Sequence, residues 1–108
     1  KIFPDREIIQ LDTSHEIFHM FFDINELAQV PGRMVTWDFG GFMNLDDPKY
    51  PPEVYAVLDD DGRVMMVANY NTDLGDGWEH TFYERYPTKY TNEAYKIGIN
   101  FLIYAFSH

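Results

Sequence analysis

The sequence predicts an α/β domain, because it combines a short leading strand, a β-hairpin and a long C-terminal helix. The chain has 108 residues, of which 45% are hydrophobic, so its size and composition fit one soluble globular domain. Aromatic residues make up 18% of the chain. Because aromatic side chains carry large burial energies, this share indicates a substantial core or a large interface.

Two short elements are predicted near the N-terminus. Residues 6–11 (REIIQL) have the β-branched composition of a strand. Residues 12–14 supply candidate N-caps for a short helix over residues 15–22 (HEIFHMFF). A Pro-Gly turn follows at residues 31–32, and the Gly- and Pro-containing stretch 37–52 is typical of a loop.

The clearest local signal is a β-hairpin. Two apolar runs, Val54–Leu58 and Val64–Tyr70, flank an Asp-Gly turn at Asp60–Gly62 and are expected to pair as antiparallel neighbours. Both runs are nearly continuous rather than alternating, which is typical of strands covered on both faces. The following stretch, residues 71–80 (NTDLGDGWEH), is rich in turn formers and acids, and we expect an ordered loop there.

A helix is predicted to begin at Thr91 or Asn92 and to run to about Phe106. Apolar residues recur at helical spacing on both of its sides, so the pattern indicates burial on most sides. A chain with so few other elements cannot provide that burial. We therefore expect the domain to continue upstream of Lys1.

Four segments carry a family resemblance, namely residues 12–24 (DTSHEIFHMFFDI), 58–71 (LDDDGRVMMVANYN), 71–79 (NTDLGDGWE) and 93–108 (EAYKIGINFLIYAFSH). They resemble the C-terminal half of the bacterial family of domain of unknown function 4159. The resemblance implies a three-layer α/β domain similar to the class I glutamine amidotransferase (flavodoxin-like) fold, in which a hairpin extends a parallel sheet between helices. It also implies that residues 1–108 are the C-terminal part of a single domain. It implies no reaction, and members are often exported from the cell.

Composition excludes several classes of function. The chain has 8 basic and 18 acidic residues, a net charge of −10, and this field repels the phosphates of nucleic acids and anionic membranes. The absence of cysteine excludes disulfides, thiolate metal sites and a cysteine nucleophile within these residues. The chain contains no apolar run of about 18 residues, so no membrane span is predicted.

His15-Glu16-x-x-His19 spells the H-E-x-x-H pattern of zinc proteases. On a long α-helix, the two histidines of this pattern share one face and hold zinc while the glutamate polarises water. Here the long helix and a third ligand are missing, and the resembling family usually has proline at the position of Glu16. We predict no zinc between His15 and His19. They are interpreted as packing or capping histidines, with a ligand-facing role as the alternative.

The densest group of polar residues follows the hairpin, and its candidate ligand-binding residues are Asn71, Asp73, Asp76, Trp78, Glu79 and His80. Sites in α/β sheets often lie at strand ends. Acidic glycine-containing loops also suit calcium, although the spacing here does not match a calcium loop. The structural interpretation is a tight turn that Trp78 anchors to the core. We predict that Asp73 or Asp76 accepts hydrogen bonds from backbone amides of the loop, and that no metal binds.

Two functions of different classes remain. The first is a non-catalytic binding or assembly module on an amidotransferase-like scaffold, whose partners are the upstream half of its own domain and a protein or small ligand. The second is a hydrolase or transferase that acts on a small molecule or carbohydrate, with part of its site upstream. Ser14 and Ser107 lack the context of a nucleophile elbow. No catalytic residue and no cofactor are predicted within the chain.

Overall fold

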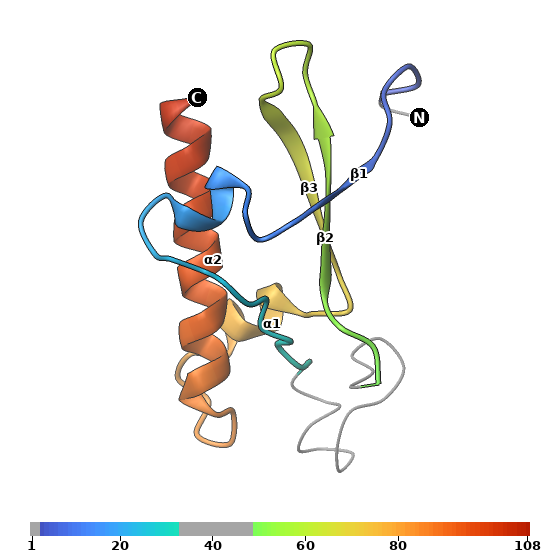
Figure 1. The fold of residues 1–108 in the computed structure, drawn as a ribbon. Helices are drawn as coiled ribbons and strands as arrows, with labels where there is room; N and C mark the ends of the chain where they lie inside the picture. The colour runs from blue at the N-terminus through green and yellow to red at the C-terminus, as the bar shows by residue number, and fades with distance from the viewer. Residues whose placement is uncertain (1–2, 33–48) are drawn as a thin grey trace.

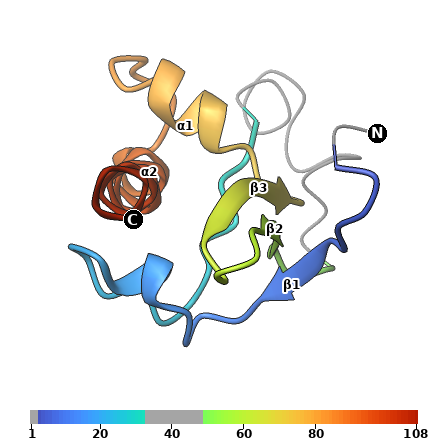
Figure 2. The ribbon, with the colours of Figure 1, turned by 90° about the horizontal axis from the view of Figure 1, so that it is seen from above.

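A computed structural model describes residues 3–32 and 49–108 of the chain. Its elements are β1 (Ile9–Leu11), the 3₁₀ helix η1 (Glu16–His19), β2 (Glu53–Leu58), β3 (Val64–Tyr70), α1 (Leu74–Glu79) and α2 (Thr88–Ser107), as Figure 1 shows. Seen along α2, the three strands lie on one side and η1, α1 and α2 on the other (Figure 2). The described residues therefore form two layers, one of strands and one of helices.

The three strands form an antiparallel sheet in the order β1-β2-β3. The pairing of β2 with β3 places Glu53 opposite Tyr70 and Leu58 opposite Val64, which confirms the predicted hairpin. At its turn, the Asp59 carboxylate accepts hydrogen bonds from the backbone N–H groups of Asp61 and Arg63. Within the described residues every strand pairing is antiparallel, so the parallel sheet implied by the resemblance is not seen there.

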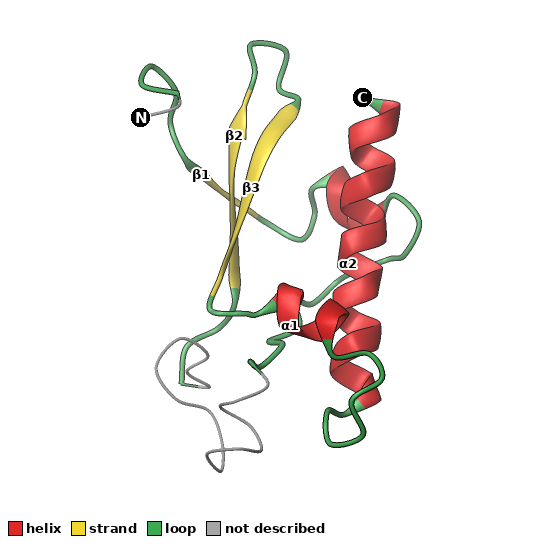
Figure 3. Cartoon of the chain, turned by 180° about the vertical axis from the view of Figure 1, so that it is seen from behind, coloured by secondary structure: helices red, strands yellow, loops and turns green. Residues whose placement is uncertain are grey.

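Burial of the hairpin differs from the sequence prediction. β2 is largely buried, whereas in β3 Met65, Met66 and Tyr70 are 36%, 37% and 59% exposed. The prediction that both runs are covered on both faces is wrong for β3 in the described structure. The reason is that β3 forms an edge of the sheet and the helices cover only one face of it (Figure 3).

The three helices also differ from their predicted bounds. The predicted helix over residues 15–22 is a single 3₁₀ turn with His15, not Asp12, Thr13 or Ser14, as its N-cap. The Asp12 carboxylate instead accepts a hydrogen bond from the backbone N–H of Ser14, which lowers the pKa of Asp12. Helix α2 begins at Thr88, one turn before the predicted start, after an N-cap at Pro87. The fixed φ of proline suits a helix start and provides this earlier beginning.

The core lies between the sheet and α2. It joins side chains from every element: Leu11, Ile17, Phe18, Ile24, Val30, Val54, Ala56, Val64, Leu74, Tyr86, Ala94, Ile97 and Tyr104. Two buried polar contacts support this core, the first between β3 and α2 and the second between two loops. The Tyr104 hydroxyl accepts a hydrogen bond from the backbone N–H of Val64 at 3.0 Å, and the Tyr86 hydroxyl donates to the carbonyl of Pro31 at 2.8 Å.

Asn100 fixes the loop after η1 to the inner face of α2. Its side chain is fully buried, and its Oδ1 accepts hydrogen bonds from the backbone N–H groups of Phe21 and Phe22 at 2.9 and 3.0 Å. Its Nδ2 donates to the carbonyl of Phe22 at 2.8 Å. Three backbone groups that would otherwise be short of partners are thus satisfied by one side chain.

The outer face of α2 remains exposed. Leu102 and Phe106 are 59% and 88% exposed, and Tyr95 and Ile99 are also accessible. The prediction that this helix is buried on most sides is wrong for the described structure. The 4-3-4 spacing of these four residues puts them in one row, opposite the buried row that contains Ala94, Ile97 and Tyr104.

Candidate functional site

The polar stretch after β3 is a short helix rather than the predicted loop. Asn71 ends the strand with φ of 57°, a left-handed conformation that asparagine tolerates better than most residues. The Asn71 side chain donates a hydrogen bond to the carbonyl of Tyr50, and its carbonyl accepts one from the Gln29 side chain. The Thr72 hydroxyl accepts a hydrogen bond from the backbone N–H of Val30. These contacts hold the start of α1 against residues 28–30, and they give Asn71 a structural role.

Asp73 is the N-cap of α1. Its Oδ1 accepts a hydrogen bond from the backbone N–H of Asp76 at 2.9 Å, which confirms the predicted bond between this carboxylate and a local amide. A capping carboxylate satisfies an amide that lacks a helical partner and also interacts favourably with the helix dipole. The sequence pattern of acids and glycines therefore begins a helix here.

Two glycines let α1 and α2 approach closely. A Cβ at Gly77 would lie 2.6 Å from the Ala94 Cβ, and a Cβ at Gly98 would lie 3.1 Å from the Trp78 ring. The Trp78 indole N–H donates a hydrogen bond to the carbonyl of Ala94 at 2.7 Å. Trp78 thus anchors α1 to α2, but it does so outside the core, with 41% of its surface exposed, and the prediction that it is anchored to the core is wrong.

Asp76, Glu79 and His80 come together on α1 and at its C-cap. The His80 Nε2 lies 3.6 Å from the Asp76 Oδ1 and 3.9 Å from the Glu79 Oε2, and one ligand atom from each of the three lies within 4.8 Å of the others. An imidazole and two carboxylates are ligand types that suit zinc. Within the described residues the group has three members, and the Glu79 side chain is 71% exposed. The absence of a bound metal stays a prediction.

The H-E-x-x-H residues do not adopt the zinc-protease arrangement. His15 caps a four-residue 3₁₀ helix, and its Nδ1 accepts a hydrogen bond from the backbone N–H of Ile17. Both ring nitrogens of His19 are engaged, Nδ1 with the Asp23 carboxylate at 3.1 Å and Nε2 with the carbonyl of Thr13 at 2.7 Å. A zinc ligand needs a free ring nitrogen, and in this arrangement His19 has none.

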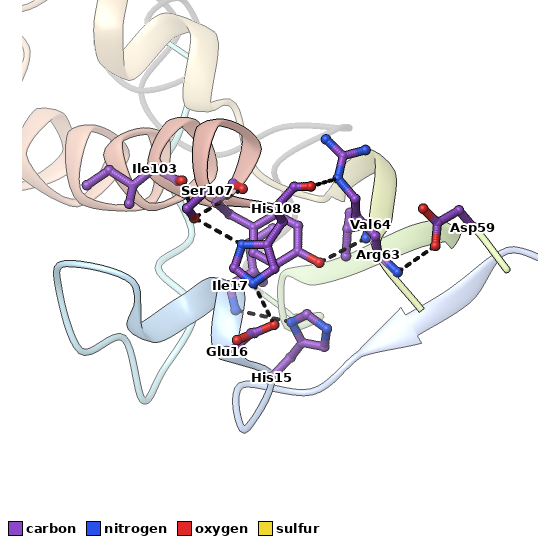
Figure 4. Close-up of polar contacts among 10 residues, drawn as sticks. His15, Glu16, Ile17, Asp59, Arg63, Val64, Ile103, Ser107 and His108 are labelled. Carbon is purple, nitrogen blue, oxygen red and sulfur yellow. Dashed lines mark hydrogen bonds and ion pairs between the residues drawn. The ribbon is translucent and has the colours of Figure 1, made fainter. Parts of the chain in front are cut away.

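A chain of hydrogen bonds joins Ser107, His108 and Glu16 at the end of α2 (Figure 4). The His108 ring contacts the Ser107 Oγ and the Glu16 Oε1, both at 3.0 Å, and stacks on Tyr104 with ring centroids 4.1 Å apart. The Ser107 hydroxyl also bonds the carbonyl of Ile103 at 2.7 Å. The order matches a hydrolase triad, but the C-terminal end of a helix presents carbonyls, which destabilise an oxyanion. This arrangement joins α2 to η1 and does not favour nucleophilic catalysis.

A contiguous apolar surface lies on the outside of the two helices. We call the exposed residues Trp78, Tyr95, Ile99, Leu102 and Phe106 the outer α2 surface. Between Trp78 and α2 it forms an apolar groove of about 340 Å³, lined by Trp78, Tyr95, Gly98, Ile99, Phe101 and Leu102. Contiguous exposed apolar surface of this kind marks an interaction site in many proteins.

The sequence model of the family described as "Domain of unknown function (DUF4159)" matches residues 1–106. The chain belongs to this family. No curated protein and no solved structure matches it. This match confirms the family named by the resemblance; the C-terminal half and the amidotransferase-like fold stay predictions, and membership of the DUF4159 family brings no reaction with it. In the described part of this DUF4159 chain, no helix is long and apolar enough to cross a membrane.

The structure separates the predicted site residues into two groups. His15 caps η1 and His19 ends it, beside the C-terminal half of α2, whereas residues 71–80 lie beside its N-terminal half (Figure 1). The sequence analysis did not identify Asn100, the close contacts at Gly77 and Gly98, or the contacts of His108. Of these, only Asn100 could have been found from the sequence, because it is an amide on the otherwise apolar inner row of α2 and buried polar groups need partners.

Proposed function

We propose that the chain is a non-catalytic binding or assembly module on a class I glutamine amidotransferase-like scaffold. The observation that carries this proposal is the outer α2 surface, where Leu102 is 59% and Phe106 88% exposed beside an apolar groove. Exposure of such side chains in water is unfavourable by about 25 cal/mol per Å² of apolar area. A partner that covers them recovers this free energy, which makes the surface suited to docking.

The proposed scaffold also assigns a role to the second face of the sheet. A three-layer fold has helices on both faces of its sheet, whereas here Met66 and Tyr70 are exposed on the face away from the core. Their positions alternate with that of Val67, which contacts the core. On this proposal residues 1–108 are the C-terminal part of one domain, and its upstream half covers Met66 and Tyr70.

The alternative, a hydrolase or transferase acting on a small molecule or carbohydrate, rests on His80. A histidine held beside a carboxylate such as Asp76 has the arrangement of a general base. Enzymatic turnover that is lost in His80→Gln, with an unchanged melting temperature, would support this alternative over the binding module.

The proposal is tested by site-specific photo-crosslinking in cells that produce the natural polypeptide. Two variants carry the photo-crosslinking amino acid p-benzoylphenylalanine, inserted by stop-codon suppression at position 102 in one variant and at position 82 in the other. Phe82 is 98% exposed and lies outside the outer α2 surface, which makes it the matched control. We expect a discrete cross-linked product from position 102 and none from position 82. Equal labelling from both positions, or from neither, contradicts a docking role for this surface.

A further inference from the structure

The row of apolar residues on α2 has the geometry of a helix-docking seam. Tyr95, Ile99, Leu102 and Phe106 follow one another at intervals of four, three and four residues. This spacing keeps side chains on one line along an α-helix and is the spacing with which a second helix interlocks. The apolar groove between Trp78 and α2, whose lining includes Gly98, offers space for an apolar side chain of the second helix.

The charged residues next to this row indicate which charge the second helix carries. A second groove, of about 350 Å³, adjoins the apolar one at Tyr95 and is lined by Phe22, Lys89, Asn92, Glu93, Tyr95 and Lys96. Lys96 pairs with Glu93 at 3.0 Å, so Lys89 supplies the excess positive charge there. α2 thus contains two lysines and one glutamate in a chain whose net charge is −10.

The charges of the chain favour some binding partners of the outer α2 surface over others. A second copy of the chain brings a charge of −10 towards another −10, which disfavours self-association. A helix with acidic residues at one end meets the opposite charge of Lys89, while its apolar row covers residues 95–106. Acidic residues are most favourable in the first turn of a helix, because they also interact with its dipole.

We propose that the outer α2 surface binds an amphipathic α-helix of a partner protein, apolar at 4-3-4 spacing and acidic in its first turn. Lys89 selects the acidic end, and the groove beside Trp78 receives an apolar side chain. The partner helix then lies parallel to α2. This inference rests on the proposed binding function and specifies the partner of the same surface.

Two synthetic helical peptides of about 18 residues test the inference, a length that covers the row at 1.5 Å per residue. Both carry leucines at 4-3-4 spacing, one with three glutamates and the other with three lysines in the first turn. Binding to the natural polypeptide that carries residues 1–108 is followed by fluorescence anisotropy. We expect the glutamate peptide to bind about tenfold more tightly, a difference of about 1.4 kcal/mol.

Three variants locate the binding. Leu102→Asp is expected to weaken both peptides at least about tenfold, since it places a charge in the apolar row. Lys89→Glu is expected to remove the preference for the glutamate peptide, and Phe82→Asp, which also adds one charge at an exposed aromatic position, is expected to change neither. Thermal melts identify any variant that fails to fold, and Ile99→Glu then replaces Leu102→Asp.

Equal affinity for the two peptides, or no binding of either, overturns the acidic helix as occupant. A dimer in sedimentation experiments that Leu102→Asp dissociates identifies a second copy instead and also overturns it. In each of these outcomes a cross-link from position 102 still supports the binding module, so the two proposals fail separately.

Discussion

The inner and outer faces of α2 are both apolar, but the inner face is buried in the core whereas much of the outer face contacts solvent. On the inner face Ala94 and Ile97 are buried, and the amide of Asn100 satisfies three backbone groups. On the outer face Leu102 and Phe106 contact solvent. Burial and hydrogen bonding stabilise a fold, whereas exposed apolar side chains do not. Substitutions on the inner face are therefore expected to lower the stability of the chain, and substitutions on the outer face are expected to leave it nearly unchanged.

Asn100→Ala is expected to have the largest effect on stability. It leaves two backbone N–H groups and one carbonyl of the loop after η1 without their partner, which costs roughly 2–4 kcal/mol of unfolding free energy. Urea denaturation of the variant and the wild type measures this difference. Asn92→Ala, in the same helix but in an exposed position, serves as the control. A loss below about 1 kcal/mol contradicts the role given to the buried amide.

Gly77→Ala tests the close contact between α1 and the inner face of α2. The added Cβ would lie 2.6 Å from the Ala94 Cβ and 3.0 Å from a Val30 methyl group, so the helices must move apart. Overpacking of this kind costs about 1–3 kcal/mol. Gly75→Ala, whose Cβ meets only the Asp73 Oδ1 at 3.6 Å, is the matched control and is expected to be tolerated. Calorimetric melting temperatures of the two variants give the comparison.

Asp73→Ala tests whether the acidic start of α1 is structural. Removal of the N-cap is expected to cost about 1 kcal/mol, while Asp73→Asn, which keeps a capping oxygen, is expected to cost less than half of that. Thermal melts of both variants distinguish a capping role from a need for negative charge. Equal destabilisation by the two substitutions would show that the charge, rather than the hydrogen bond from Asp76, is what matters.

Leu102→Asp is expected to have the smallest effect on stability, because Leu102 lies on the exposed outer face of α2. Leu102 is 59% exposed, and its replacement is expected to change the unfolding free energy by no more than about 0.5 kcal/mol. Ile97→Asp, one side chain of the buried row, is expected to unfold the chain. If Leu102→Asp lowers the melting temperature as Ile97→Asp does, the two faces of α2 do not differ.

Elements defined by local residues were predictable. The hairpin with its Asp-Gly turn, a C-terminal helix ending near Phe106 and the bond from a local amide to Asp73 all follow from neighbouring residues. The residues that start α1 were recognised as ordered, but not as helical. Gly75 and Gly77 lower helix propensity, and only the contact with Ala94 explains why a glycine is required at position 77.

The sequence alone determined which segments form strands and the C-terminal helix, because periodicity and turn chemistry act between residues close in the chain. Tertiary structure decided which row of α2 is buried, since both rows are apolar and only contacts with η1 and α1 distinguish them. It also decided the role of Asn100, whose partners Phe21 and Phe22 lie 79 and 78 residues away in the sequence. Apart from the amide at position 100, long-range packing of this kind leaves no trace in local sequence patterns, so the exposed row that we propose as the binding surface emerged only from the fold.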